Sequence, residues 1–284
     1  MTDPAPLVLA PPDAEERRRR RAGRFERIGR WAFPLAVVLL LLAAWDRIVV
    51  WNDIPPYVLP SPRLVIGTLA TDWPVLLPAL LVTLQITLLA LLAAVLGGVG
   101  LAVLFTQSRL AEMSFYPYAV ILQVTPLVAI APLIFIYVGS KLAALLLCAW
   151  IVAFFPVLSN TTLGLRSADH NLQDLFRIYG ATRWQRLRYL QAPAALPYFL
   201  GGLRIAGGLS LIGAVVAEYV AGTGGTGSGL AFRILEASYR LNIPRMFAAL
   251  LLIALTGVAI YGALNLLSYM LLRKWHESAV RRER

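Results

Sequence analysis

Six apolar stretches, each long enough to cross a lipid bilayer, constrain this chain more than any other feature of its sequence. A spanning helix needs about 20 mostly apolar residues. Charged residues are only 14% of the chain and apolar residues are 59%, which is more apolar surface than a water-soluble fold of this size can bury. The sequence therefore predicts an all-α integral membrane protein. The predicted spans are residues 31–50, 78–105, 115–138, 142–158, 198–221 and 247–272.

Basic side chains are distributed unequally between alternate loops. With the N-terminus inside, the cytoplasmic segments hold 19 Lys and Arg, and the outer segments hold five. Such an excess retains loops in the cytoplasm. The net charge of +11 is thus interpreted as a topology signal rather than a nucleic-acid-binding face, and both termini are predicted to be cytoplasmic.

The sequence divides into a membrane part and two tails. Residues 1–30 carry eight arginines and are predicted to be a disordered basic cytoplasmic tail that also touches anionic membrane lipids. Residues 31–275 make up the six-span domain, and residues 276–284 form a second basic cytoplasmic tail. The long basic region and the lack of a clean cleavage site argue against a signal peptide.

Catalytic and metal-binding chemistry find little support. Cys148 is the single cysteine, which excludes an intramolecular disulfide and a cysteine-based metal cluster. His170 and His276 lie far apart and have no neighbouring ligands at metal spacing. A membrane-embedded enzyme would need clustered ionisable groups within the spans, and none is evident. Transport is favoured, with a secondary transporter not driven by ATP as the alternative.

Residues 159–197 form the one long loop predicted on the cytoplasmic side. Apolar residues recur at helical spacing as far as Tyr179, and Gly180 interrupts that helix. A second short helix follows, which Pro193 and Pro197 are expected to end. It carries Arg183, Trp184, Arg186, Leu187 and Arg188. Such an element is either a docking surface for a soluble partner or a surface helix lying on lipid.

This loop resembles the cytoplasmic coupling motif of binding-protein-dependent ABC importer permeases: Glu-Ala-Ala, three residues, Gly, nine residues, Ile-x-Leu-Pro. Gly180 and Pro193 match at the right separation, whereas Asp174, Leu175 and Phe176 replace Glu-Ala-Ala. The stretches YGATRWQRLRYLQAPAALPYFLGGLRIA and TPLVAIAPLIFIYVG are similar to the nitrate, sulfonate and taurine branch, which also includes carriers of pyrimidine precursors.

The resemblance implies a type I ABC importer permease in the bacterial inner membrane. Two six-span subunits, expected as a homodimer, would form the pathway. ATP and Mg would bind to separate ATPase subunits, so this chain would hold no cofactor, and an extracytoplasmic solute-binding protein would deliver the solute. The branch suggests a sulfonate, nitrate, taurine or a pyrimidine precursor. The residues implied to couple the ATPase to the pathway are Asp174, Gly180, Ala181, Arg183, Trp184, Arg186 and Pro193.

Polar residues within the predicted spans are candidates for lining the pathway, because polar groups in a bilayer need a partner or a function. Each has a structural alternative: snorkelling for Arg204, an interfacial position for Glu218, and contacts between helices for the others. The candidates are Gln85, Gln123, Thr125, Arg204 and Glu218, together with Pro126, because a proline frees a backbone carbonyl that can face a water-filled path. Five glycines of the fifth span are expected to permit close helix packing: Gly201, Gly202, Gly207, Gly208 and Gly213.

The stretch GTGGTGSG at 222–229 fits the glycine spacing of a dinucleotide-binding loop. No Lys follows its last glycine, and a transmembrane span rather than a β-strand precedes it. Nucleotide binding is therefore not expected. The stretch is predicted to turn the chain outside the membrane, before a short helix that ends ahead of Pro244, and either to contact the binding protein or only to make this turn.

Overall fold

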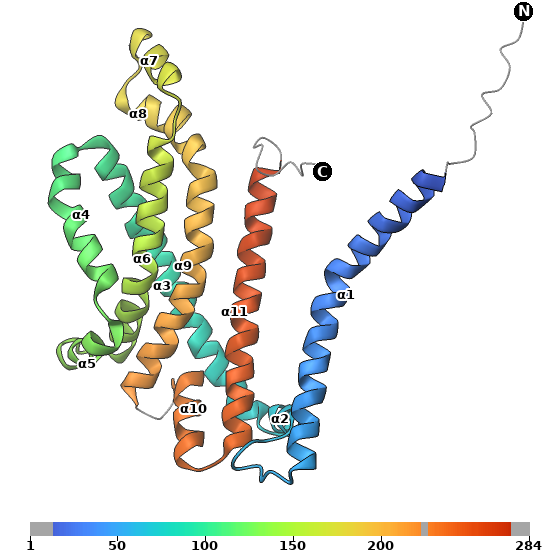
Figure 1. Cartoon of the computed structure of the whole chain (residues 1–284). Coiled ribbons are helices and arrows are strands. Elements are labelled where there is room, and N and C mark those ends of the chain that lie inside the picture. The colour runs from blue at the N-terminus through green and yellow to red at the C-terminus, as the bar shows by residue number, and fades with distance from the viewer. Residues whose placement is uncertain (1–13, 223–226, 274–284) are drawn as a thin grey trace, which may run out of the picture. The chain divides into compact units, whose positions relative to one another are not determined.

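The computed structural model describes residues 14–222 and 227–273, with side chains from Ala32 onward (Figure 1). All regular elements in these ranges are helices. They are α1 (Ala14–Trp51), α2 (Pro62–Thr71), α3 (Trp73–Gln107), α4 (Arg109–Val124), α5 (Leu127–Tyr137), α6 (Lys141–Arg166), α7 (His170–Ile178), α8 (Arg183–Arg186), a π-helical turn (Leu187–Gln191), α9 (Ala192–Ala221), α10 (Leu230–Tyr239) and α11 (Ile243–Leu272). The chain divides into two units, residues 1–64 and 65–284, which are described separately.

The first unit consists mainly of α1. Its apolar part, Ala32–Trp51, is long enough to cross a membrane, and only 6% of its most apolar window is buried within the chain. The helix starts at Ala14, so the predicted tail of residues 1–30 overlaps it from there. The rest of that tail, and the predicted C-terminal tail 276–284, lie outside the described residues.

The second unit is built around α6, which packs mainly on α9 and on α3. Small residues allow the close approach: a Cβ on Gly213 would lie 2.8 Å from the Ala149 Cα, and one on Gly202 would lie 2.7 Å from the Pro156 carbonyl oxygen. Gly207 is crowded in the same way by Leu264 of α11. The packing role predicted for these three glycines is thus confirmed, whereas Gly201 and Gly208 face open space.

Within residues 14–222 and 227–273, five helices are long and apolar enough to span a membrane, and a sixth span results if α4 and α5 count as one. These two helices meet at an angle of 105°. Thr125 ends α4 with extended backbone angles, because the ring of the following Pro126 disfavours the helical region for the residue before it, and Pro126 is then the N-cap of α5. The predicted third span is therefore not one straight helix, although five to six apolar helices agree with the predicted fold class.

The chain stays helical between α8 and α9, which corrects the expectation that Pro193 and Pro197 end a helix before the fifth span. The π-helical turn Leu187–Gln191 comes immediately before Pro193, which occupies the first turn of α9. The Ala192 N–H donates to the Leu187 carbonyl across this π-helical turn, so the chain remains helical up to Pro193 although Pro193 itself has no N–H to donate. The short helix α8 is thereby joined to α9 without an intervening loop.

Candidate functional site

The segment between α6 and α9 projects from one end of the second unit, and α10 lies at the opposite end (Figure 1). We call residues 169–191 the α7–α8 element. Asp169 caps α7 by accepting hydrogen bonds from the backbone N–H of Asn171 at 2.7 Å and of Leu172 at 3.2 Å. None of the α7 side chains is buried, and Ile178 and Tyr179 are more than four-fifths exposed. The helix therefore presents free apolar surface.

Gly180 ends α7 in the manner expected from the sequence. Its φ is +71°, in the left-handed region that side chains with a Cβ rarely adopt. The Gly180 N–H donates to the Arg177 carbonyl at 3.0 Å, and the Ala181 N–H donates to the Phe176 carbonyl at 2.9 Å. These two bonds make a Schellman motif, which satisfies carbonyls at the helix end. A Cβ on Gly180 would meet nothing within 4 Å, so the requirement for glycine is one of backbone conformation.

The helix α8 begins with a capping box. The Thr182 hydroxyl accepts from the Gln185 backbone N–H at 3.2 Å, and the Gln185 side chain accepts from the Thr182 N–H at 2.7 Å. This reciprocal pair stabilises a helix too short to persist alone. Arg183 donates to the carbonyl of Gln107, the last residue of α3, at 3.5 Å. The turn is thus fixed locally and is also tied to the transmembrane body.

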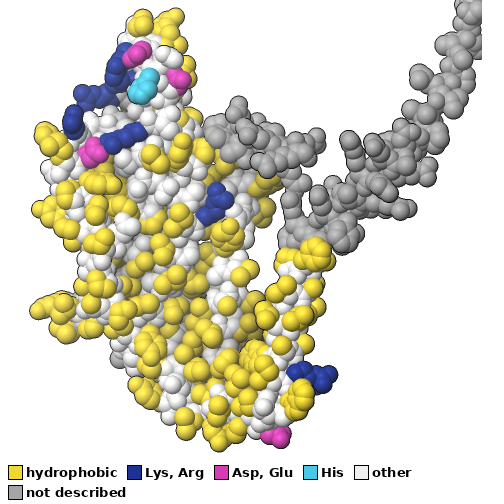
Figure 2. Space-filling model, viewed as in Figure 1, with side chains coloured by type: hydrophobic (Ala, Val, Ile, Leu, Met, Phe, Trp, Pro, Cys, Tyr) yellow, Lys and Arg dark blue, Asp and Glu magenta, His cyan; other side chains and the backbone are white. Residues whose placement is uncertain are grey.

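Basic side chains gather at the α7–α8 element (Figure 2). A polar cleft of about 290 Å³ lies between this element and the end of α3. Its lining includes Arg177, Arg183 and Arg186 together with Gln107 and Gln191. Arg177 pairs with Asp174 at 3.2 Å, and both of these side chains are about two-thirds exposed. Three guanidinium groups around one cleft make a site suited to a carboxylate.

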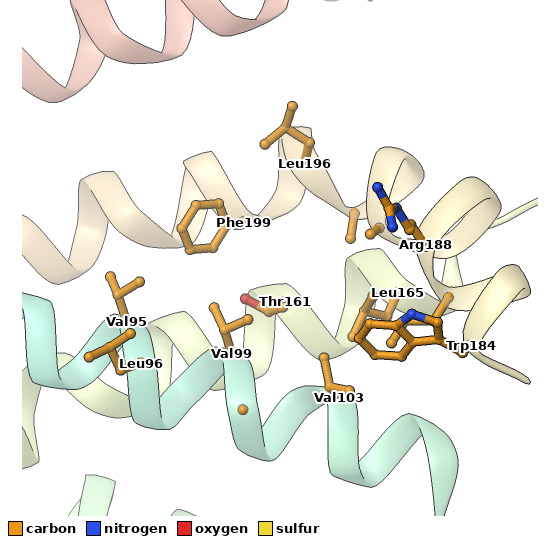
Figure 3. Close-up of a pocket in the computed structure, with 14 residues that line it drawn as sticks. Val95, Leu96, Val99, Val103, Thr161, Leu165, Trp184, Arg188, Leu196 and Phe199 are labelled. Atoms are coloured by element: carbon orange, nitrogen blue, oxygen red, sulfur yellow. The ribbon is translucent and has the colours of Figure 1, made fainter.

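Trp184 and Leu187 connect the element to the spans. Leu187 is buried in the main apolar core. The Trp184 indole closes one end of an apolar groove of about 800 Å³ that runs between α3, α6 and α9 (Figure 3). Val99 of α3 and Phe199 of α9 line opposite walls of this groove. A displacement of α8 would be passed to α3, α6 and α9 through Leu187, because this side chain is packed in the core that the three helices share.

The predicted pathway residues do not form one cluster. Gln85 on α3 and Gln123 on α4 are exposed on the isolated chain, as is Pro126. Thr125 is partly buried and donates its hydroxyl hydrogen to the Ile121 carbonyl at 2.7 Å. Polar side chains exposed along membrane helices need water or a second protein surface around them.

The two charged candidates on α9 have partners within the chain. Arg204 donates to the Asn265 side chain of α11 at 3.0 Å and to the Leu200 carbonyl at 3.3 Å. Glu218 is 3% exposed and accepts hydrogen bonds from Thr83 of α3 and from the backbone of α10. Both residues therefore link helices, and that is their role in the isolated chain.

Sequence reasoning missed several of these partners. The capping box could have been found, because Thr182 and Gln185 have the spacing T-x-x-Q. The contact between Arg183 and Gln107 joins residues 76 positions apart, and no local pattern indicates it. The ion pair of Arg245 with Asp72, at 2.5 Å, likewise joins α11 to the residue before α3 across 173 positions.

Comparison with known proteins gives the geometry a family context. Residues 94–282 match the family described as "Binding-protein-dependent transport system inner membrane component". The riboflavin transport system permease protein RibX of Chloroflexus aurantiacus is 38% identical over 85% of this chain and 89% of its own length. The formylaminopyrimidine transport permease protein ThiX of Halalkalibacterium halodurans is 31% identical over 84% and 94%.

A third relative is the putative aliphatic sulfonates transport permease protein SsuC of Bacillus subtilis, 29% identical over 92% of both chains. Among solved structures, an amino acid ABC transporter with histidines superposes with a TM-score of 0.59, at 21% identity, over 71% of this chain and 96% of that chain. This likeness shows the fold alone. The chain belongs to the family of binding-protein-dependent transport system inner membrane components, and it is a multi-pass ABC importer permease of the nitrate, sulfonate and taurine branch that its sequence resembles.

Proposed function

We propose that this chain forms the translocation pathway of an ATP-driven importer in the bacterial cytoplasmic membrane, with both termini in the cytoplasm. The observation that carries the proposal is the α7–α8 element, an exposed helical projection held by its own caps and joined without a break to α9. The distribution of Lys and Arg supports the orientation that places this element inside.

The α7–α8 element is the proposed contact with the ATPase subunit. The exposed apolar side chains Ile178 and Tyr179 would enter a cleft of that subunit, and an acidic side chain of the ATPase would bind among Arg177, Arg183 and Arg186. Gly180 and Ala181 fix the angle between α7 and α8. Trp184 and Pro193 lie where α8 meets the spans, so closure of the ATPase dimer would move α9 directly.

At the opposite end, α10 is the proposed contact with the solute-binding protein. It carries an ion network in which Glu236 pairs with Arg233 at 2.9 Å and with Arg240 at 3.1 Å. Arg240 is 70% exposed and available to an acidic side chain of a docked protein. The glycine-rich stretch before α10 connects it to α9, and no contact with the binding protein is proposed for this stretch, since residues 223–226 lie outside the described part.

Two copies of the chain are the proposed pathway unit. A Cβ added to Gly201 or Gly208 of α9 would meet no described residue within 4 Å, and Ile205 and Ile212 on α9 are more than half exposed. Small residues at open positions suit close packing of a second helix. Gln85 and Gln123 are the proposed pathway residues, and membrane lipids would surround the remaining apolar surface, including α1.

The proposed substrate is a solute that contains a pyrimidine ring, such as a flavin or a thiamine-precursor pyrimidine. Support comes from the names of two relatives above 30% identity, which are permeases for riboflavin and formylaminopyrimidine. Sulfonate, nitrate and taurine permeases are related at 26–29% identity, which makes an oxyanion or a sulfonate the second candidate.

Reconstituted transport tests these proposals. The chain, its ATPase subunit and its binding protein are placed in proteoliposomes, and uptake of labelled riboflavin, formylaminopyrimidine, taurine and nitrate is compared with and without ATP inside. ATP-dependent uptake of one of the two heterocycles is expected. Uptake that follows a proton gradient without ATP would instead establish a secondary transporter, and ATP-dependent uptake of taurine or nitrate alone would overturn the substrate class.

A further inference from the structure

The first turn of α10 is held by side chains from two other helices. The residue at its N-cap, Gly229, has no side chain, so it cannot satisfy the first N–H groups of the helix. The Leu230 N–H donates to the Thr83 hydroxyl of α3 at 2.9 Å, and the Ala231 N–H donates to Oε2 of Glu218 at 3.1 Å. Residues far away in the sequence therefore cap α10.

The two capping side chains are also bonded to each other. The Thr83 hydroxyl accepts from the Leu230 N–H, and its own hydrogen has two acceptors within reach, Glu218 Oε2 at 3.1 Å and the Ala79 carbonyl oxygen at 3.2 Å. Thr83 is fully buried and Glu218 is 3% exposed. A buried carboxylate is costly unless it is hydrogen-bonded or paired. Lys141, at the start of α6, adds electrostatic attraction to this carboxylate.

The position of Glu218 is unfavourable on its own helix and favourable on the next one. It lies in the last turn of α9, where the helix dipole repels a negative charge. Its carboxylate instead occupies the N-terminus of α10, where free N–H groups and the dipole attract a negative charge. The contact with α10 thus offsets the electrostatic repulsion of Glu218 at the end of α9. Separating the two helices would leave this repulsion uncompensated.

Gly229 leaves the space that the carboxylate fills. Its backbone is extended, with φ of −86° and ψ of −173°, so the conformation itself does not require glycine. A Cβ at this position would collide with the Oε1, Cδ and Oε2 atoms of Glu218. The requirement for glycine is therefore steric, and it exists only while the carboxylate is in place.

We propose that Glu218 and Thr83 are positioning residues that lock the first turn of α10 to α3 and α9, so that a binding protein docked on α10 moves these spans. We call this arrangement the Glu218 lock. The inference rests on the proposed function, because it gives α10 a partner. In this proposal, Glu218 passes the movement caused by docking of the binding protein from α10 to α3 and α9, and it does not contact the solute.

The lock itself is tested by amide hydrogen exchange of the purified chain over residues 229–239. Glu218→Ala should speed exchange of the Leu230 and Ala231 amides by about tenfold or more, because each loses or weakens its acceptor. Thr87→Val is the matched control: Thr87 is equally buried one turn away on α3, and among the described residues its hydroxyl bonds only the Thr83 carbonyl, at 2.8 Å. Unchanged exchange in Glu218→Ala, or equal acceleration in Thr87→Val, would overturn the lock.

Transmission is tested by ATP hydrolysis of the reconstituted complex, measured with and without the binding protein. Glu218→Ala and Thr83→Val should lose most of the stimulation by the binding protein while basal hydrolysis stays unchanged. Glu218→Gln should retain most of it, because both hydrogen bonds to the carboxylate use Oε2, and the amide oxygen of Gln can accept them in the same way. A variant whose basal and stimulated rates fall together, or full stimulation in Glu218→Ala, would contradict transmission.

A double-mutant cycle separates the steric role of Gly229 from general damage. Gly229→Ala alone should reduce stimulation about as much as Glu218→Ala. In the Glu218→Ala background the same change should have little further effect, since the space is then free. Additive losses would contradict the lock.

The two levels of the proposal can fail separately. If the binding protein does not stimulate ATP hydrolysis by the wild-type complex, the proposed function and the transmission step are refuted. The hydrogen-exchange measurement on the purified chain still tests the Glu218 lock in that case.

Discussion

The two ends of the second unit are stabilised in contrasting ways. Apart from the Arg183–Gln107 contact and the buried Leu187, the α7–α8 element is held by bonds to near neighbours in the sequence: the Asp169 cap, the Schellman motif at Gly180 and the Thr182–Gln185 capping box. The junction of α9 with α10 depends on bonds that cross 135 and 147 positions. A self-contained projection can move as one body, whereas the junction ties separate helices together. The contrast suits a coupling element at one end and a docking platform at the other.

The largest effect is expected from Gly180→Val. A β-branched residue at a φ of +71° is strained by about 1–3 kcal/mol, although its side chain meets nothing, so the turn should change shape while membrane insertion remains normal. ATP-driven uptake should fall by about tenfold or more. Gly180→Asn, which tolerates this conformation, should retain most activity.

Gly139→Val is the control for Gly180→Val. Gly139 also has open space around it, but its φ is not in the left-handed region. The control should transport normally. Wild-type uptake by Gly180→Val in the same vesicles would contradict the coupling role of this turn.

The next largest effect is expected from Gly202→Ala in α9, for which the adjacent Gly201 provides the control. Gly202→Ala places a Cβ 2.7 Å from the Asn160 Cβ and the Pro156 carbonyl oxygen of α6, and overpacking of this kind costs about 1–3 kcal/mol. The midpoint temperature of thermal unfolding in detergent should therefore be lower than that of the wild type. Gly201→Ala, which meets nothing within 4 Å of the isolated chain, should unfold like wild type. Equal shifts would show that packing of α9 on α6 is not the cause.

A smaller and local effect is expected from Asp169→Ala. Loss of a side-chain N-cap destabilises a helix by about 1 kcal/mol. Because α7 is held by local bonds, hydrogen exchange should accelerate only within residues 169–179, and the Glu218 lock should be unaffected. Acceleration that spreads to α10 would contradict the independence of the two ends.

The smallest effect on stability is expected from Asp174→Ala. Its ion pair with Arg177 is exposed and contributes only about 0–1 kcal/mol. If Asp174 contacts the ATPase, binding of that subunit should weaken although α7 remains folded. Arg63→Ala, which removes an exposed guanidinium paired with Asp46 at 3.3 Å, is the control and should leave ATPase binding unchanged. Identical ATPase affinity in both variants would remove Asp174 from the coupling surface.

The same contrast explains how much could be predicted from the sequence. Apolar runs of span length, the break at Gly180 and the short helix after it depend on local rules, and the structure confirms them. The effect of each proline on its helix was harder to predict. Pro126 separates two helices that meet at 105°, whereas Pro193 does not interrupt the helix because a π-helical turn precedes it. A proline allows both outcomes, and packing against other helices selects one.

The partners of buried polar residues could not be predicted. The sequence marks Glu218 as a charge in the fifth span, whereas it does not mark Thr83 as its partner. The hydrogen bond between them depends on the packing of α3 beside α9, which no pattern in either segment specifies. The sequence therefore indicated which polar residues needed an explanation, and the tertiary structure supplied it.

Site-specific photocrosslinking from the two ends tests the central claim most directly. Ile178 on α7 and Tyr239 on α10 are each 82% exposed, so they offer matched positions for a cysteine that carries a photoreactive group. In the assembled complex, Ile178→Cys should crosslink to the ATPase subunit and Tyr239→Cys to the solute-binding protein. Crosslinking of Ile178→Cys to the binding protein, or to lipid alone, would contradict the account.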